Sequence, residues 1–390
     1  MKLKKIFFKH SLTLMLILCT SFCSYAQYDS IPYDGYDRTY LVHLPAGYTG
    51  NTNLPLIIAM HGGFGNAYNA QNQSQLSVKA DLENFIVVYP EGVEGGSLNI
   101  SSWNAGWCCG FSSNNNIDDV GFIDSLLNTL ISEYAIDTNR IYATGMSNGG
   151  FMAYRLACEL SDRIAAIAPV ACSMSMTSCT PSRPMPIIHF HSTLDSNVPY
   201  LGGYGDGFSN HYNSPLDSVL NAWSNKNTCS TINDTIINNS QYIFKKWTNC
   251  DCSSEIHYYR TEDGGHSWPG GVQTTTGDPA STYINATDLM WDFFQEHSLD
   301  CNPLKVSDVF FNEENISIYP NPTQGDFIVD LGANYNSVKV SIRDLNGKLV
   351  QSNEFNNSQS LNLTIDEPVG VYLLRIESDK KTAVIRLVKE

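Results

Sequence analysis

The stretch RIYATGMSNGG, at positions 140–150, decides the fold class of this chain. Residues 140–144 have the length of a buried strand. Beyond the glycines, Met152, Leu156 and Leu160 recur at the spacing of one helix face. The hydrophobic period therefore changes from strand to helix across a turn of small residues, which predicts a strand–turn–helix unit.

The same alternation extends in both directions from this unit. Three continuous apolar runs have the length of strands that helices cover on both faces: 54–60, 85–89 and 186–191. Helical periodicity marks residues 119–131, where Asp118 or Asp119 can cap the first turn, and residues 287–294. Strands that alternate with helices predict an α/β fold with a mostly parallel sheet.

The composition and the hydrophobic periodicity of the sequence change after Pro303. Cysteine, tryptophan and helical periodicity disappear, and short apolar runs separated by turn residues replace them. The dipeptide Asn346-Gly347 between two such runs is a strong hairpin signal. Seven or so short strands predict a small all-β sandwich at 313–390, joined to the first domain by a linker at 301–312.

The N-terminus has the pattern of a secretory signal peptide. Lysines precede an apolar run at 12–22, and small residues precede a cleavage site after Ala26. Lipid attachment at Cys23 is a weaker alternative because the residue before it is a bulky phenylalanine. The predicted organisation is therefore a signal peptide at 1–26 and an α/β domain at 27–300.

Composition excludes several classes of protein. The chain is 42% hydrophobic and 16% charged, which is too apolar for a disordered protein. Its net charge of −16 excludes a general nucleic-acid binder, which needs a positive surface. No other apolar run reaches the ~18 residues of a membrane span. We therefore expect a secreted protein with no nucleic-acid partner and no transmembrane anchor.

Nine cysteines follow the predicted signal peptide. Disulfides are the default in an exported protein, and because nine is odd, at least one thiol is free or pairs between chains. A zinc site built from Cys229, Cys250 and Cys252 is the alternative, but its spacing fits no common structural zinc module. The connectivity cannot be deduced from the sequence.

Ser147 is the candidate nucleophile. It is the serine of Gly145-Met146-Ser147-Asn148-Gly149, and a Gly-x-Ser-x-Gly sequence between a strand and a helix is typical of a turn that exposes a serine hydroxyl. A serine hydroxyl is a poor nucleophile at neutral pH and needs an imidazole that accepts its proton.

His266 is the candidate base. Four glycines and a proline surround it in residues 264–271, which predicts a rigid loop that presents its side chain. His189 and His191 lie in a predicted strand, where a structural role is favoured.

Asp195 is the candidate acid that accepts the other imidazole N–H. It follows the strand at 186–191 and lies between Ser147 and His266 in the chain, in the order serine, acid, histidine. Asp206 and Asp217 satisfy the same order and remain rivals, although both lie in an insertion rich in glycine, asparagine and serine.

Two backbone N–H groups are needed to stabilise the oxyanion of the attacked carbonyl. One is that of Asn148, directly after the nucleophile. The other is that of Gly63 or Phe64, in the glycine-rich loop after the strand at 54–60. We interpret His61 as the residue whose ring braces this loop.

Aromatic residues are concentrated where the rim of such a site is expected. Phe64 adjoins the oxyanion loop, Tyr200 follows the acid, and Trp268 follows the base. We predict that Tyr200 and Trp268 bind substrate, although each could instead pack its own loop. Flat aromatic surfaces suit a feruloyl ring or the face of a sugar.

From about residue 38 to residue 294 the chain resembles the secreted α/β-hydrolase esterases that include polyhydroxybutyrate depolymerases and feruloyl esterases of carbohydrate esterase family 1. The likeness is carried by the serine, acid and histidine segments and by three further motifs: WNAGWCC at 103–109, DDVGF at 118–122 and VPY at 198–200. It implies an α/β-hydrolase fold and a serine esterase that needs no cofactor and no metal.

The last 80 or so residues resemble the C-terminal sorting domain of the Bacteroidetes type IX secretion system. Three motifs carry this likeness: YPNP at 319–322, DLNGK at 344–348 and GVY at 370–372. The resemblance implies passage through the outer membrane by the type IX machinery, usually with loss of this domain.

The expected function is hydrolysis of polymer-linked esters through an acyl-enzyme, with a polymeric or oligomeric ester as substrate. Feruloyl or acetyl esters of plant polysaccharide are favoured, and polyhydroxybutyrate is the alternative. A rival from another class is a catalytically silent surface protein that binds carbohydrate. The intact set of Ser147, Asp195 and His266 argues against that rival.

Overall fold

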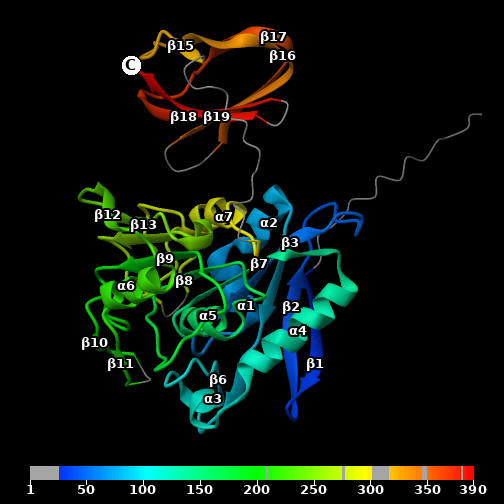
Figure 1. Cartoon of the computed structure of the whole chain (residues 1–390), viewed down its shortest axis with the longest axis vertical. Coiled ribbons are helices and arrows are strands. Elements are labelled where there is room, and N and C mark those ends of the chain that lie inside the picture. The colour runs from blue at the N-terminus through cyan, green and yellow to red at the C-terminus, as the bar shows by residue number, and fades with distance from the viewer. Residues whose placement is uncertain (1–25, 208–209, 275–276, 301–315, 345–348, 379–380) are drawn as a thin grey trace, which may run out of the picture.

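A computed structural model describes residues 26–207, 210–274, 277–300, 316–344, 349–378 and 381–390. Residues 1–25 of the predicted signal peptide and the whole predicted linker lie outside these residues, and Ala26 lies inside them. The described part contains an α/β domain and a smaller all-β domain (Figure 1).

The α/β domain is built on a ten-stranded sheet. Its strand order is β1-β2-β4-β3-β7-β8-β9-β14-β13-β12, and all neighbouring pairs from β4 to β14 are parallel. The six parallel strands are β4 (Ile86–Pro90), β3 (Leu54–Met60), β7 (Ile136–Met146), β8 (Ala166–Val170), β9 (Ile187–Ser192) and β14 (Ile256–Thr261). The mostly parallel sheet predicted from the sequence is therefore confirmed.

Antiparallel strands extend the sheet at both edges, and the sequence patterns had not indicated them. They are β1 (Ala26–Tyr33), β2 (Tyr36–His43), β13 (Tyr242–Thr248) and β12 (Thr231–Asn238). Two small ribbons lie outside the sheet: β5 (Val93–Gly95) with β6 (Ile100–Ser102), and β10 (Gly203–Tyr204) with β11 (Tyr212–Asn213).

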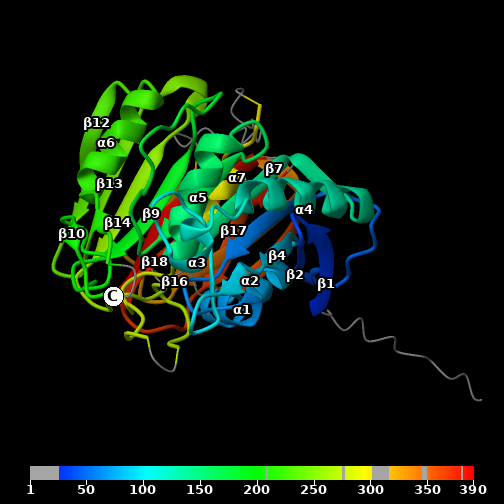
Figure 2. The ribbon, with the colours of Figure 1, turned by 90° about the horizontal axis from the view of Figure 1, so that it is seen from below.

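Helices cover both faces of this sheet (Figure 2). One face carries α4 (Asp119–Glu133), α5 (Asn148–Glu159) and α6 (Leu216–Lys226). The other carries α1 (Ala67–Ser74), α2 (Leu76–Glu83) and α7 (Ala286–Gln295). Short helical turns occur at α3 (Gly110–Asn114) and at η1 (Asp251–Ser253).

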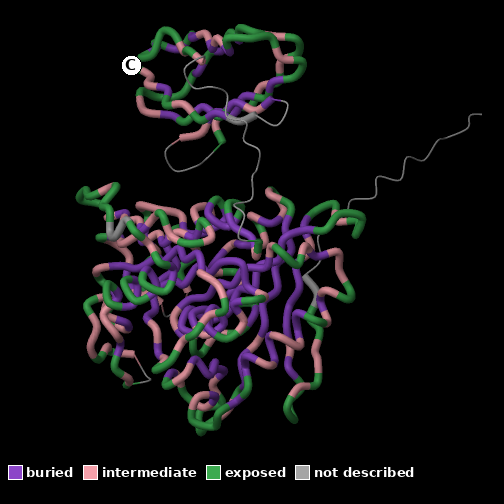
Figure 3. Tube along the Cα trace, in the orientation of Figure 1, coloured by how far each residue is buried: buried purple, intermediate pink, exposed green. Residues whose placement is uncertain are grey.

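The strands are apolar on both faces because both faces are covered. In β3 every residue is buried, with Leu56 and Ile58 packed in the core on the α4 side and Ile57 and Ala59 in the core on the α1 side. Successive side chains of a strand point to opposite faces, so a continuous apolar run fills two cores at once. Figure 3 shows the buried residues gathered along these central strands.

The C-terminal domain is all-β, as predicted, but it has fewer and longer strands. Its five strands are β15 (Ser317–Tyr319), β16 (Asp326–Asp344), β17 (Leu349–Thr364), β18 (Gly370–Ser378) and β19 (Lys381–Lys389). They form one antiparallel sheet that curls around its own core. The long strand β16 pairs with β15 near its start and with β18 near its end, so it joins the two sides of the core.

Disulfides pair most of the described cysteines. Cys158 is bonded to Cys179 and Cys229 to Cys250, while Cys108 is bonded to its neighbour Cys109. Cys252 is also disulfide-bonded. Because Cys229 and Cys250 bond to each other, their thiolates cannot form the alternative zinc site. Cys172 is the free cysteine among the described residues and is buried, and Cys301 lies outside them.

A buried ion pair joins the edge of the sheet to helix α4. The Arg38 guanidinium of β2 lies 2.6 Å from the carboxylate of Asp119, and both side chains are nearly inaccessible. Burial lowers the pKa of Arg38 and raises that of Asp119, so each charge depends on the other. The other Asp119 oxygen accepts the backbone N–H of Asn104, 2.7 Å away, which ties the loop at 103–109 to the pair.

We predict that Arg38→Met destabilises the α/β domain by about 3–5 kcal/mol, because it leaves the Asp119 charge buried without its partner. Urea unfolding followed by tryptophan fluorescence measures this domain, since all six tryptophans lie in it. The matched control is Arg140→Met, which breaks the half-exposed pair with Asp137 and is expected to cost less than about 1 kcal/mol. Equal losses for the two variants would contradict the prediction.

Candidate active site

Ser147 lies on a strained turn between β7 and α5. Its backbone angles are φ 55° and ψ −124°, a conformation that residues with a side chain rarely adopt. The turn is held on both sides, because the Ser147 N–H donates to Val170 O at 2.9 Å and its carbonyl accepts the Phe151 N–H at 2.9 Å. The structure thus has the strand–turn–helix geometry that the sequence predicted around this serine.

The glycines around Ser147 allow the turn to touch strand β3. A Cβ atom at Gly149 would lie 2.6 Å from the carbonyl oxygen of His61 and would also overlap that of Met60. At Gly145 a Cβ atom would lie 2.8 Å from the same Met60 oxygen. No larger residue fits at either position without moving the backbone. The absence of side chains therefore brings the serine turn beside the loop that follows β3.

Asp195 and His266 form a hydrogen-bonded pair. The His266 Nδ1 lies 2.9 Å from Asp195 Oδ2, and Asp195 Oδ1 accepts the backbone N–H groups of Asn197 and Val198 at 3.0 and 2.8 Å. The Asp195 side chain is fully buried, whereas His266 is partly exposed. Neutral imidazole that donates from Nδ1 has its lone pair on Nε2, as a general base requires.

Opposing effects act on the Asp195 carboxyl. Burial raises its pKa, but His266, His191 and the Val198 N–H outweigh burial and hold the pKa below its usual value. Asp195 therefore stays ionised at neutral pH. Of its rivals, Asp217 is largely exposed in α6 and faces Lys245 at 3.5 Å, and Asp206 lines the same cavity as Ser147 and His266, whereas Asp195 is the carboxylate bonded to His266.

Ser147 and His266 line one cavity of about 860 Å³. The loop after β3 forms part of its wall, and a Cβ atom at Gly62 would lie 3.4 Å from that of Ser147. The structure thus brings the serine, the histidine and the glycine-rich loop together. Of the two predicted donors in that loop, Phe64 already gives its N–H to Ser101 O at 3.2 Å, so Gly63 is the better candidate.

His61 braces the loop as the sequence suggested. Its Nε2 accepts the Gly92 N–H at 3.0 Å, so its Nδ1 carries the proton and donates to Gly62 O at 2.7 Å. Burial lowers the pKa of His61 to about 4, which keeps the ring neutral. A neutral ring with both nitrogens engaged is a structural group and not a base.

Asn148 links the serine turn to the loop at 103–109. Its side-chain amide pairs with the backbone of Trp103, accepting the N–H at 2.7 Å and donating to the carbonyl at 3.0 Å. The Trp103 indole N–H donates to His61 O at 3.0 Å. Sequence reasoning had assigned Asn148 only its backbone N–H, and the side-chain clamp is an additional role.

The structure gives no support to the predicted substrate contacts of Tyr200 and Trp268. Trp268 is only 3% exposed, and its indole N–H donates to Thr287 at 3.0 Å within the core. The Arg260 guanidinium lies over the Tyr200 ring, 4.8 Å from the ring centroid. Neither residue lines the cavity that contains Ser147. Trp268 packs against helix α7 and Tyr200 against β14, so each ring has its partners away from that cavity.

Phe64 lines the cavity, as the sequence indicated, together with apolar side chains that the sequence did not mark. Phe64 is 55% exposed at the rim, and Phe111 and Leu98 contribute further apolar surface, whereas Phe151 lines the cavity with only 2% of its surface exposed. Phe111 lies on the short helix α3, and Phe151 lies on the largely buried helix α5. No local sequence pattern therefore marks either of them as a cavity residue. Only the WNAGWCC motif, which ends two residues before Phe111, pointed to this region.

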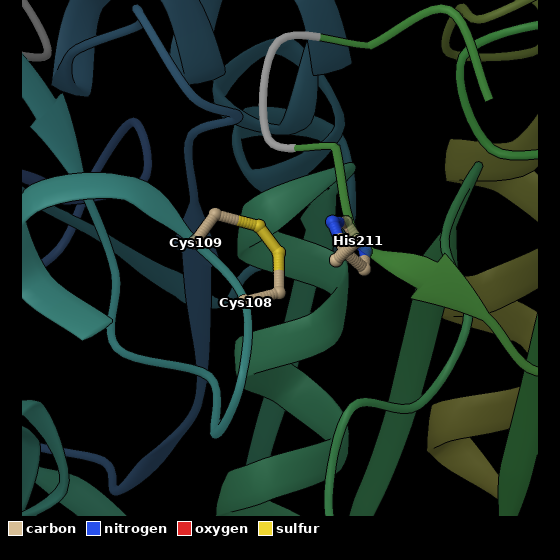
Figure 4. A group of neighbouring side chains, drawn as sticks. All are labelled: Cys108, Cys109 and His211. Carbon is tan, nitrogen blue, oxygen red and sulfur yellow. A yellow bond between two sulfur atoms is a disulfide. The ribbon is translucent and has the colours of Figure 1, made fainter. Parts of the chain in front are cut away.

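A disulfide and a histidine form one side of the cavity (Figure 4). The ligand atoms of Cys108, Cys109 and His211 lie within 4.8 Å of one another, a spacing that a metal ion could use. The two sulfur atoms are bonded to each other, so they offer no thiolate to a metal. The His211 ring meets the Phe151 ring edge-on at 5.4 Å.

The remaining cavity wall is polar and carries no cation. Among its described residues the charged ones are Asp206 and Asp278, and none is lysine or arginine. Several side-chain amides line the same wall: Asn69, Gln73, Asn114, Asn115 and Asn197. Amides of this kind form hydrogen bonds with hydroxyl groups, whereas the two carboxylates repel an anionic ligand.

Comparisons with known proteins agree with these features. Residues 38–198 match the family model described as "Esterase PHB depolymerase", and residues 317–390 match that of the "Secretion system C-terminal sorting domain". The chain is 29% identical over 271 residues to feruloyl esterase B of Piromyces equi, covering 67% of this chain and 46% of that protein.

Further relatives carry related descriptions. The chain is 27% identical over 272 residues to a bifunctional acetylxylan esterase/xylanase of Neocallimastix patriciarum, covering 68% of this chain and 34% of that protein. It thus spans less than half the length of these first two relatives. A probable feruloyl esterase C of Aspergillus niger is 26% identical over 266 residues, which cover 66% of this chain and 83% of the relative.

Among solved structures, an acetyl xylan esterase from Aspergillus awamori superimposes with a TM-score of 0.48 at 12% identity, covering 69% of this chain and 99% of that one. The sequence matches confirm the resemblance to the esterase group and to the sorting domain. The chain therefore carries the sorting domain of a secreted or cell-surface protein. In the part of the chain that the structure describes, no helix has the length and apolar character to cross a membrane.

We predict that Gly149→Ala lowers the stability of the α/β domain by several kcal/mol, because the new methyl group overlaps two backbone carbonyls that cannot move independently. Tryptophan fluorescence during urea unfolding measures the loss. Gly63→Ala is the matched control for stability, because a Cβ atom there meets nothing within 4 Å. An unfolding midpoint of Gly149→Ala equal to that of the control would show that the close approach is absent.

Proposed function

We propose that this protein is a secreted serine carboxylic-ester hydrolase that acts on polymer-linked esters through an acyl-enzyme. The observation that carries the proposal is the 2.9 Å pair of Asp195 and His266 beside the cavity where Ser147 occupies its strained turn. Serine, histidine and aspartate in this arrangement make a serine hydroxyl nucleophilic. The organisation that we propose is a catalytic domain at 27–300 and a sorting domain at 313–390, with a signal peptide at 1–26 and a linker at 301–312.

The first half of the reaction forms the acyl-enzyme. His266 Nε2 takes the proton of the Ser147 hydroxyl while Ser147 Oγ forms a bond to the ester carbonyl carbon. The N–H groups of Asn148 and Gly63 stabilise the oxyanion, each by roughly 3 kcal/mol. The bond to the alcohol oxygen then breaks, and the departing alcohol takes the proton from His266. The acyl group stays on Ser147.

Water completes the reaction by the same steps. His266 takes a proton from water, the hydroxide oxygen bonds to the acyl carbon, and Ser147 Oγ leaves with the proton that His266 returns. Asp195 stays ionised throughout and stabilises the imidazolium that forms twice in each cycle. No step needs a cofactor or a metal.

The cavity supports a neutral polysaccharide ester as substrate. Side-chain amides suit sugar hydroxyls, and Phe111 and Phe64, the second of which the sequence already indicated at the rim, offer aromatic surface. Asp206 and Asp278, without a cation beside them, disfavour substrates with free carboxylates. Relatives described as feruloyl and acetylxylan esterases agree with this choice. The "Esterase PHB depolymerase" match keeps polyhydroxybutyrate as the second candidate.

The C-terminal domain supports export by the type IX secretion machinery. Its core is formed by its own strands, and the cores of the catalytic domain contain none of its residues. A domain with a separate core can be removed after export while the catalytic domain keeps its packing. We propose that the esterase then works in the extracellular space or at the cell surface.

We predict that Ser147→Ala abolishes ester turnover and that Asp195→Asn and His266→Ala each lower kcat by about 10⁴-fold or more, because the three residues act as a unit. Hydrolysis of a short-chain nitrophenyl ester measures the loss. Asp217→Asn is the matched control and is expected to retain full activity. If Asp195→Asn kept near-normal activity, the acid would have to be another carboxylate.

We predict that the purified enzyme releases ferulate or acetate from feruloylated arabinoxylan or acetylated xylan and releases little 3-hydroxybutyrate from polyhydroxybutyrate. The amide-lined wall is the reason, because a polyester offers no hydroxyl groups to it. Chromatography of the released acids measures the preference. Release of 3-hydroxybutyrate alone would overturn the substrate while leaving the serine mechanism intact, and the Ser147→Ala variant is the blank for all three polymers.

A further inference from the structure

A buried chain of hydrogen bonds leads from the core to the loop that carries Asp195. The Tyr154 hydroxyl of α5 lies 2.9 Å from His189 Nδ1, and His189 Nε2 lies 3.2 Å from His191 Nδ1 in β9. The His191 Nε2 lies 2.8 Å from Val198 O and 3.4 Å from Asp195 Oδ2. All of these side chains are buried, and the proposed mechanism uses only the last of them, Asp195.

The partners fix the direction of every bond in this chain. Val198 O and the ionised Asp195 can only accept, so His191 Nε2 carries a proton. A neutral His191 then has its lone pair on Nδ1, which must accept from His189 Nε2–H. The remaining nitrogen of His189, Nδ1, must accept from the Tyr154 hydroxyl. The neutral chain therefore has one consistent arrangement in which every donor meets an acceptor.

We propose that His191 and His189 are positioning residues of the catalytic site: the chain from Tyr154 holds His191 in the tautomer that donates to Val198 O and turns the same N–H toward Asp195. That nitrogen lies 3.4 Å from Asp195 Oδ2, the oxygen that also contacts His266, and the loop that carries Asp195 is tied to β9 through Val198. This inference rests on the proposed function, because that function assigns Asp195 to catalysis. The position of the proton on His191 can be measured whether or not the protein is active.

A neutral donor suits this position better than a cation. A cation beside Asp195 would neutralise the carboxylate and weaken its support of the His266 imidazolium, whereas an imidazole N–H orients the oxygen and leaves the charge in place. Burial lowers the pKa of His191 and that of His189, in agreement with two neutral rings. The two rings stack with centroids 5.5 Å apart, which limits their rotation.

The titratable groups that face this chain are few. His266 comes from the loop after β14 and meets Asp195. Cys172 follows β8, adds to the effect of burial on the pKa of Tyr154, and has its own pKa raised by burial and by Asp195. Tyr258 of β14 presents its ring edge to His189 at 5.9 Å. Burial raises the pKa of Cys172, of Tyr154 and of Tyr258, so all three are neutral at the pH of the assay.

The first test reads the tautomer directly. We expect ¹⁵N NMR of histidine-labelled full-length protein, at neutral pH, to show His191 and His189 as neutral rings protonated at Nε2. His191→Gln and His189→Gln assign the two signals. In Tyr154→Phe, His189 loses its donor and its Nδ1 resonance moves. A charged ring or a proton on Nδ1 of His191 would overturn the proposal, even if the enzyme proved inactive on every ester.

The second test compares His191→Gln with His191→Asn. The amide of glutamine reaches the position of Nε2 and preserves the donor to Asp195, whereas that of asparagine ends near Nδ1 and does not. Without the donor the carboxylate of Asp195 is less stabilised, so the Asp195–His266 pair keeps its proton to higher pH. We therefore expect the acid limb of kcat/KM to move up by about half to one pH unit in His191→Asn, with kcat about tenfold lower.

The glutamine variant is expected to keep the wild-type acid limb and most of kcat. Equal pH profiles for the two variants would overturn the positioning role. Tryptophan fluorescence during unfolding verifies that both variants fold, and Tyr154→Phe supplies a milder change should they not: it is expected to lower kcat two- to threefold with the acid limb shifted in the same direction. An unchanged profile in a folded Tyr154→Phe would likewise count against the chain. Absence of ester hydrolysis by the wild-type enzyme refutes the proposed function and leaves the NMR result to decide the tautomer.

Discussion

The site depends on one close approach between two pieces of backbone. The end of β3 and the turn after β7 touch through Gly145 and Gly149, where a single added carbon would meet the carbonyl oxygens of Met60 and His61. Parallel neighbours in a sheet end at the same edge, so the loops after them are brought together by topology. The glycines reduce that separation to contact. They set the glycine-rich loop directly beside Ser147, which neither element could do alone.

The loop at 103–109 converts this contact into a fixed arrangement. It is bound to the serine turn through Asn148, to the neighbouring loop through the His61 carbonyl, and to the helix layer through Asp119. Asp119 in turn forms an ion pair with Arg38 of β2, the strand next to the edge strand β1. A buried ion pair that does not touch the serine turn itself thus helps to locate the backbone around it. Geometry at the site is therefore a property of the whole α/β domain.

The predictable parts of the structure are those that local pattern determines. The strand β3 and the helix α4 were evident because continuous burial and a 3.6-residue period are properties of neighbouring residues. Asp195 and His266 could be predicted because chain order and loop composition restrict the choice. The edge strands β1 and β12 carry mixed polar sequences, since none of their described side chains is buried, and no pattern distinguished them from loops.

The direction in which a loop side chain points could not be predicted from the sequence pattern. Trp268 turns inward because Thr287 and the apolar core on that face of the sheet contact it. Thr287 belongs to α7, a helix that follows Trp268 in the chain. Phe111, by contrast, points into the cavity. Its short helix α3 shows no pattern that predicts this, because the cavity forms only when the chain folds and brings α3 and the serine turn to the same site. The disulfide pairing of Cys229 with Cys250 likewise follows from how β12 and β13 meet, and not from spacing.

The left-handed backbone at Ser147 bears on how such a chain evolves. Glycine adopts φ 55° without strain, whereas a serine held there costs the native state of order 1–3 kcal/mol. Mutation and selection for durability alone would therefore favour glycine at this position. A lineage that kept the fold only to bind polysaccharide would gain stability by losing its hydroxyl. A serine at 147 is therefore held at a cost to stability, which the proposed acyl-enzyme mechanism accounts for.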